Sequence, residues 1–137
     1  MVCIYCGGLT FVINSRHQRQ SNNIWRRRQC RSCRAIFTTH EKPDLKTGLM
    51  VQSSNSPHLQ PFVRDKLFLS IYTSCSHRSN ALDEASELTK TVIAKIGQPT
   101  DAVIHTKTIA ATAAAILERF DPVAATVYRA YHPTLKP

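Results

Sequence analysis

Two cysteine pairs near the amino terminus constrain this chain more than any other feature. Cys3 and Cys6 form one C-x-x-C pair, and Cys30 and Cys33 form a second. Two such pairs, separated by a segment long enough for an antiparallel hairpin, can close tetrahedrally around one zinc ion. Each pair makes a tight turn that directs two sulfurs to the same point. The spacing therefore predicts a rubredoxin-like zinc ribbon that holds one structural Zn²⁺ per chain.

Disulfides or redox-active dithiols are the alternative interpretation of these cysteines. That alternative requires an oxidising compartment or a thioredoxin-like environment. The sequence indicates neither, because no apolar run resembles a signal peptide and the first cysteine follows Met1 almost at once. We therefore expect a cytoplasmic protein. Cys75 has no partner pair, so we expect it to be a small buried apolar residue on a helix.

Positive charge is concentrated in the same segment as the cysteine pairs. Residues 1–48 carry nine Lys/Arg against two Asp/Glu, a net +7, whereas the remaining 89 residues contribute only +2. Four thiolates on one zinc ion would leave about +5 on the first segment. Clustered arginines predict a surface that binds phosphate backbones. The alternative is a solvated charged face that aids solubility.

Three short strands are expected around the cysteine pairs, over residues 11–13, 24–30 and 35–39, with 17–23 as a polar loop. Alternation on the second strand places Arg26 and Arg28 on one face and Trp25 and Arg27 on the other. One flat surface cannot use all of these arginines, so the ribbon would twist or enter a groove edge-on. Trp25 could stack on a sugar or base, or it could pack against the hairpin.

The remainder of the chain has the pattern of a small helical domain. Residues 42–61 form a joint that includes a short strand near 49–51, and Pro61 precedes an amphipathic helix. Further helices are expected over 81–96, 107–120 and 122–131, which begin after Asn80, Thr106 and Asp121. Gly97 is expected to end the first of these in the C′ position. No run of about 18 apolar residues indicates a membrane span. The apolar faces are expected to comprise Leu67, Phe68, Ile71, Tyr72 and Cys75; Ile109, Ile116, Leu117 and Phe120; and Val123, Val127, Tyr128 and Tyr131.

Motifs in the first 41 residues resemble those of the NrdR family, which are bacterial zinc-ribbon repressors of ribonucleotide reductase genes. The matching motifs are Val12-Ile13-Asn14-Ser15-Arg16, Arg26-Arg27-Arg28-Gln29-Cys30 and Phe37-Thr38-Thr39-His40-Glu41. The chain departs from the family at three positions. Asn14 stands in place of an aspartate, and Trp25 and Ile36 stand in place of arginines. Each lost arginine that reads a base changes binding by about 1–3 kcal/mol, so the resemblance implies retuned DNA binding.

The second part resembles, more weakly, the ATP-cone domain of the same family. Gln60-Pro61-Phe62 with Asp65-Lys66-Leu67, and Val123-Ala124 with Val127-Tyr128-Arg129, carry this resemblance. It implies a short hairpin with four helices, nucleotide contacts at Gln52, Gln60 and Lys66, and ATP or dATP as allosteric effectors. Gln52 stands near the position of a family lysine that meets phosphate, and a lost lysine removes a charge that binds polyphosphate directly. Lys66 is alternatively a solvated helix charge.

These observations predict an α+β protein with a zinc ribbon over 1–45 and an ATP-cone-like domain over 46–137. The resemblance implies a repressor that binds double-stranded operator DNA through Arg16, Trp25, Arg26, Arg27 and Arg28. It also implies a homo-oligomer whose size depends on the bound nucleotide. A zinc-ribbon module that binds RNA or a protein remains the alternative. No glycine-rich phosphate loop, paired carboxylates or nucleophile–base motif indicates an enzyme.

Overall fold

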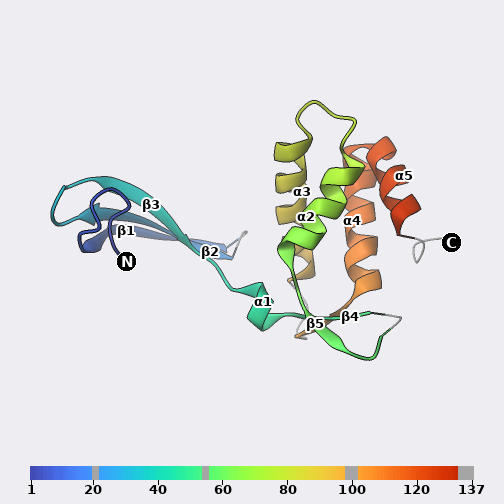
Figure 1. Ribbon diagram of the computed structural model, residues 1–137, viewed down its shortest axis with the longest axis horizontal. Coiled ribbons are helices and arrows are strands. Elements are labelled where there is room, and N and C mark those ends of the chain that lie inside the picture. Colours follow the sequence, from blue (N-terminus) through green and yellow to red (C-terminus); the bar gives the residue numbers. More distant parts are fainter. Residues whose placement is uncertain (20–21, 54–55, 98–101, 133–137) are drawn as a thin grey trace. The chain divides into compact units, whose positions relative to one another are not determined.

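The computed structural model describes residues 1–19, 22–53, 56–97 and 102–132. The chain divides into two compact units, Met1–Pro43 and Asp44–Pro137. The first unit is an antiparallel sheet that carries the four cysteines, and the second is helical with a small mixed sheet (Figure 1). The α+β class expected from the sequence is confirmed. Within the described ranges, no helix is both long and apolar enough to cross a membrane.

The first unit is a three-stranded sheet with β2 in the centre. Its strands are β1 (Thr10–Gln18), β2 (Asn23–Cys30) and β3 (Ile36–Glu41), in the order β1-β2-β3 (Figure 1). β1 is longer than the expected strand over 11–13, because Asn14, Ser15 and Arg16 continue to pair with β2. Their side chains are exposed, so pairing buries no polar group. The expected loop over 17–23 was therefore too long.

The second unit combines one short and four longer helices with a small sheet. The helices are α1 (Leu45–Gly48), α2 (Arg64–Ser74), α3 (Ala81–Ile96), α4 (Thr106–Phe120) and α5 (Pro122–Tyr131). The strands are β4 (Met50–Gln52), β5 (Leu59–Pro61) and β6 (Val103–His105). β4 pairs antiparallel with β5, as the expected hairpin requires, and parallel with β6. Neither α1 nor β6 was expected, because segments this short show no periodicity.

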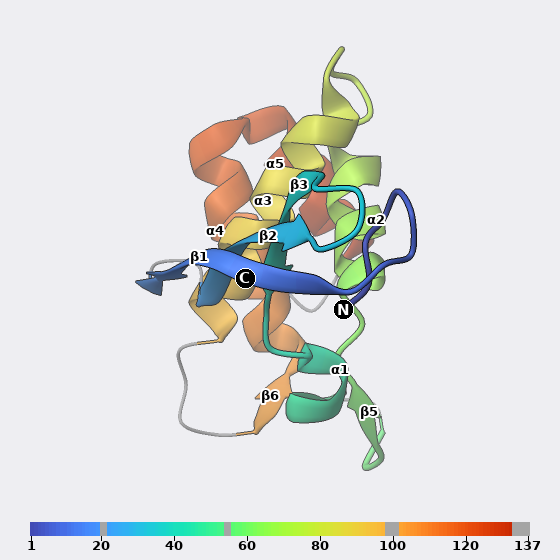
Figure 2. The same cartoon turned by 90° about the vertical axis from the view of Figure 1, so that its left-hand side faces the viewer.

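The core of the second unit lies between helices α2, α3, α4 and α5, which Figure 2 shows from a second direction. Cys75 is fully buried there, as expected. Much of the remaining core consists of alanine, which lets neighbouring helices approach closely. Members of this core include Leu67, Ile71, Ala85, Val92, Ala113, Leu117, Ala124, Ala125 and Tyr128.

The expected apolar faces of α4 and α5 were partly wrong. Val123 and Tyr131 are 57% and 69% exposed, whereas the neighbouring Ala124 is buried. Phe120 is 40% exposed and lies under the guanidinium of Arg78, 4.8 Å from ring centroid to Cζ. Of the residues expected on the apolar face of α5, Tyr128 is buried, and the other buried positions of this helix are Ala124 and Ala125.

The caps that we expected at the helix ends are only partly confirmed by the structure. Asp121 caps α5 as expected, because its Oδ1 accepts hydrogen bonds from the backbone N–H groups of Val123 and Ala124. Asn80 precedes α3, but its side chain makes no capping hydrogen bond. Gly97 has a φ of −79° and does not adopt the left-handed conformation of a C′ glycine. Thr106 is the first residue of α4, not its cap.

Candidate metal centre and nucleic-acid interface

Each cysteine pair lies in a tight turn at one end of the ribbon. In the first turn the Cys3 N–H donates to Gly8 O at 2.8 Å, and Gly7 N–H donates to Cys3 O at 3.0 Å. Gly7 has a φ of +71°, which glycine adopts at little cost. The second turn repeats this pattern, with Cys30 N–H donating to Ala35 O at 3.0 Å. The two turns are therefore similar frames that each present two sulfurs.

The two cysteine turns approach each other closely at Gly8, which explains why this position has no side chain. A Cβ on Gly8 would lie 2.6 Å from Ser32 Oγ and 3.3 Å from Cys30 Sγ. Arg31 N–H also donates to Leu9 O at 3.0 Å, which joins one turn to the other. A side chain at position 8 would therefore collide with the opposite turn.

The four cysteine sulfurs meet at one point, as predicted. They all lie within 4.8 Å of one another. Cys3 Sγ is 3.7 Å from Cys33 Sγ, and Cys6 Sγ is 3.5 Å from Cys30 Sγ. Sulfurs bound tetrahedrally at about 2.3 Å from zinc lie about 3.8 Å apart, whereas a disulfide requires about 2.05 Å. The geometry therefore fits a Cys₄ zinc site.

Backbone N–H groups favour the thiolate form of Cys30, which is the form that binds zinc. The pKa of the Cys30 thiol is lowered to about 6, chiefly because the Cys33 N–H donates to its sulfur, with help from the Ser32 N–H at 3.3 Å. Tyr5 N–H points at Cys3 Sγ from 3.5 Å. With four protein ligands, the site would leave zinc no open position for chemistry. Its function is structural.

The apolar core of the ribbon is too small to hold the sheet by itself. In the described part of this unit, the buried cluster contains Cys3, Cys30 and Phe37, with Ala35 packed against it. Tyr5 adds an edge-to-face contact with Phe37, with ring centroids 6.5 Å apart. Units with so little buried apolar surface require a metal or disulfides to fold. The zinc site is therefore the centre of this unit.

Strand register sorts the ribbon's side chains onto two faces, because directly paired residues project to the same side. We name these faces after one residue of β2. The Trp25 face comprises Phe11, Asn14, Arg16, Trp25, Arg27, Gln29, Ile36, Thr38 and His40. The Arg26 face comprises Val12, Ser15, His17, Ile24, Arg26, Arg28, Phe37, Thr39 and Glu41. The predicted separation of Arg27 from Arg26 and Arg28 follows from this register.

A β-bulge decides where Arg16 points. The register shifts between Val12 and Asn14, so one extra residue of β1 has no partner on β2. Because of this shift Arg16 pairs with Trp25. Its guanidinium lies over the indole ring, 5.9 Å from the centroid. An uninterrupted register would have placed Arg16 on the Arg26 face.

The arginines on the two faces differ in their contacts. Arg26 Nη2 forms an ion pair with Glu41 Oε2 at 2.7 Å, and Arg28 Nε donates to Thr39 Oγ1 at 3.1 Å. Both side chains are half-buried against the sheet. Arg27 is exposed, and its guanidinium has no ion-pair partner among the described residues. Arg16 is exposed as well.

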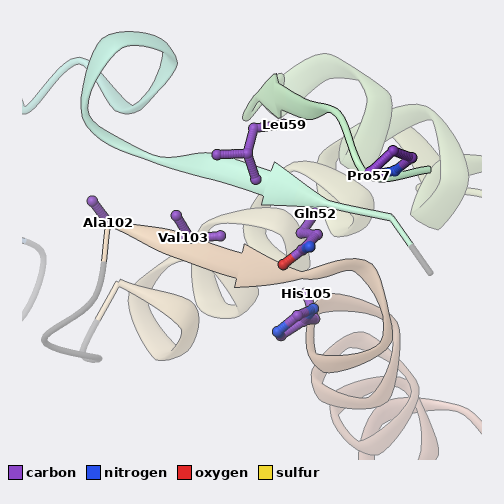
Figure 3. A pocket seen from close by; sticks show the side chains of 6 residues that line it. All are labelled: Gln52, Pro57, Leu59, Ala102, Val103 and His105. Atoms are coloured by element: carbon purple, nitrogen blue, oxygen red, sulfur yellow. The ribbon is translucent and has the colours of Figure 1, made fainter. Parts of the chain in front are cut away.

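An open pocket of about 620 Å³ lies on the small sheet of the second unit. Its lining residues are Gln52, Pro57, Leu59, Ala102, Val103 and His105 (Figure 3). Gln52 pairs with His105, and Figure 3 shows their side chains close together. Gln60 pairs with Val51 and so projects from the opposite face of the sheet. Lys66 is exposed in the first turn of α2. Of the three candidate nucleotide contacts, only Gln52 lines this pocket, and no described lining residue is Lys or Arg.

A polar cluster in the second unit was missed by sequence reasoning. Arg78 donates to Glu84 Oε2 at 2.5 Å and to Asp121 Oδ2 at 3.0 Å, and His77 Nε2 lies 2.9 Å from the same Asp121 oxygen. The pKa of Asp121 is lowered to about 2, chiefly by the hydrogen bond from His77 and also by that from Arg78. The cap at Asp121 was visible in the sequence. Its partners were not, because they lie more than forty residues away.

One serine–histidine pair also appears in the second unit. Ser70 Oγ lies 2.8 Å from His132 Nε2, and the His132 ring lies against the Tyr128 ring, with centroids 4.2 Å apart and planes tilted by 32°. No carboxylate among the described residues contacts His132, whereas a catalytic base is normally oriented by a third group. The pair therefore serves to attach the end of α5 to α2.

The fold and the site define a class: a basic zinc ribbon followed by a small helical domain. Residues 1–41 match the family described as "Transcriptional repressor NrdR-like, N-terminal domain". The chain is 31% identical over 136 residues to transcriptional repressor NrdR of Streptococcus sanguinis, with 96% of this chain and 85% of that protein covered. It is 33% identical over 136 residues to NrdR of Heliobacterium modesticaldum, with 96% and 88% covered. The chain belongs to the NrdR family of transcriptional repressors, as its motifs indicated.

Proposed function

We propose that this protein is a repressor, not an enzyme, and that its zinc ribbon binds double-stranded operator DNA of ribonucleotide reductase genes in the cytoplasm. The observation that carries the proposal is the placement of cationic side chains on a metal-centred sheet with little negative charge. The exposed Arg16 and Arg27 share one face with the half-buried Trp25, and Arg26 and Arg28 lie on the other face. The relatives' names, which describe transcriptional repressors, support the same function.

A binding comparison tests this function. We expect the zinc-loaded full chain to bind a duplex with paired A·T-rich boxes more tightly than a structured RNA of equal length, measured by fluorescence anisotropy. Each neutralised phosphate contributes a slope of about −0.9 to the dependence of log affinity on log salt. Equal or tighter binding to the RNA would contradict the proposal.

We further propose that the helical unit carries self-association and that ATP or dATP binds it only weakly. Exposed apolar side chains on its helices support self-association, namely Leu69, Leu82, Val123 and Tyr131. Weak nucleotide binding is supported by the lack of Lys and Arg among the described pocket residues. Mass photometry with and without each nucleotide, combined with isothermal titration, tests both statements. Tight nucleotide binding would contradict the second.

A protein-binding zinc module is the second candidate function, and one observation favours it. The first cysteine turn exposes Val2, Ile4, Tyr5 and Leu9, each by more than half. Apolar side chains gathered on a small unit are typical of protein contacts. If this candidate is right, Ile4→Ser should abolish binding of a protein partner to the first cysteine turn and leave the affinity for duplex DNA unchanged.

A further inference from the structure

The Trp25 face consists of three rows that run across the sheet. The row nearest the metal holds Phe11, Gln29 and Ile36; the middle row holds Asn14, Arg27 and Thr38; and the third holds Arg16, Trp25 and His40. The middle row therefore presents an amide, a guanidinium and a hydroxyl side by side. All three side chains of this row are exposed. Such a row offers directional hydrogen bonds, which a simple phosphate clamp does not need.

The spacing of these groups suits the edges of stacked base pairs. Alternate residues of a strand, such as Arg27 and Gln29, lie about 6.8 Å apart, and neighbouring strands about 4.8 Å apart. Base pairs follow one another every 3.4 Å, so Arg27 and Gln29 would be about two base-pair steps apart. The major groove admits a two-stranded β-ribbon. β1 and β2 form an antiparallel pair at one edge of the three-stranded sheet, and Asn14 and Arg27 lie opposite each other on this pair.

Building on the proposed function, we propose that the Trp25 face is the base-reading surface of this repressor, with Asn14 and Arg27 as its specificity-determining residues. An asparagine amide pairs with the N6 and N7 atoms of adenine, and an arginine with O6 and N7 of guanine. Asn14 reads an A·T pair and Arg27 a nearby G·C pair. Arg16, whose guanidinium lies over the Trp25 ring, contacts the adjacent phosphate backbone of the DNA.

The opposite face is less suited to this task. The Glu41 carboxylate lies on it, and 61% of its side chain is exposed, so it would repel phosphates. The same carboxylate holds Arg26, while Thr39 holds Arg28. These two arginines stabilise the sheet and position the Trp25 face. The β-bulge after Val12 is what brings Asn14 and Arg16 to the reading face.

The test starts from a selection of random-sequence duplexes with the zinc-loaded full chain. The enriched duplex and a scrambled version are then titrated with Asn14→Ala, Arg27→Ala and, as a matched control on the same strand, Arg28→Ala. We expect Asn14→Ala to lower the preference for the enriched duplex about 5- to 150-fold, while affinity for the scrambled duplex stays unchanged. Arg27→Ala should cause a similar loss of preference. The main effect of Arg28→Ala should be a lower thermal midpoint of the ribbon, with a smaller loss of preference for the enriched duplex.

A second readout is the base that the chain selects. Asn14→Asp keeps the size of the side chain but removes its donor, so it should change the selected base at one position towards cytosine. If Asn14→Ala weakens both duplexes equally, or neither, the assignment of Asn14 is wrong. If Arg28→Ala abolishes the preference with zinc content and thermal midpoint intact, the Arg26 face reads DNA and the proposal is overturned. A wild-type chain that enriches no duplex contradicts the proposed function itself.

Discussion

The ribbon and the helical unit are stabilised in opposite ways. In the described residues, three side chains form the ribbon's buried cluster, whereas nineteen form that of the helical unit. The ribbon depends on four sulfurs from two turns at one point, and its strand β1 exposes most of its side chains to solvent. The helical unit depends on apolar packing between α2, α3, α4 and α5. Because the metal site replaces a large apolar core, the ribbon can leave the Trp25 face of its sheet free for recognition.

Features that depend on neighbouring residues could be predicted from the sequence, whereas features that depend on strand pairing or helix packing could not. The cysteine turns and the Arg26-Arg27-Arg28 motif are local, so their residues and their alternation could be predicted. The face of Arg16 could not be predicted, because it depends on a bulge that exists only when β1 pairs with β2. In α5, periodicity fits Val123 and Tyr131 as well as Ala124 and Tyr128. Which set is buried depends on the side of α5 that packs against α4 and α2, and this packing is not local in the sequence.

The largest expected effect comes from removing the metal site. Cys33→Ser, or chelation under reducing conditions, should unfold the ribbon and abolish duplex binding, because structural zinc contributes about 10 kcal/mol or more to folding. The helical unit should remain folded, because its core lies elsewhere. Circular dichroism at 222 nm and amide protection by NMR distinguish the two units.

Cys75→Ala is the matched control for the metal site. Cys75 is buried in the helical core, so the variant should keep one zinc per chain and its duplex affinity. Protected ribbon amides after exhaustive chelation would show that the ribbon does not depend on zinc, and the contrast between the units would fail.

The next effect is expected from a cavity in the helical unit. Leu117 is fully buried, so Leu117→Ala should lower the free energy of unfolding of this unit by about 2–5 kcal/mol. Zinc content should not change. Urea unfolding monitored by circular dichroism measures the loss, and Leu82→Ala serves as the control because Leu82 is 62% exposed. Equal losses for both variants would mean that the assigned core is wrong.

As the pH is lowered, the two units should unfold in a defined order. Zinc affinity falls with pH because its ligands bind deprotonated, so the ribbon should unfold first. The pKa of Asp121 is lowered from 3.8 to about 2, so its contribution to stability is present above pH 4 and is lost as the pH falls towards 2. Asp121→Asn should remove this part of the pH dependence, whereas the exposed Asp83→Asn should leave it. An acid titration by circular dichroism would contradict this order if helical signal is lost before zinc.

The smallest expected effect concerns the pocket on the small sheet. Gln52 and Gln60 lie on adjacent residue pairs of β4 and β5 and so project from opposite faces. Gln52→Lys would add a cation to a pocket whose described lining has no Lys or Arg, whereas Gln60→Lys adds the same charge outside it. We expect Gln52→Lys to raise ATP affinity about tenfold, on the order of 1.4 kcal/mol, and Gln60→Lys to change it little. Isothermal titration measures both. Equal gains would mean that ATP responds only to net charge, and the pocket would then have no part in nucleotide recognition.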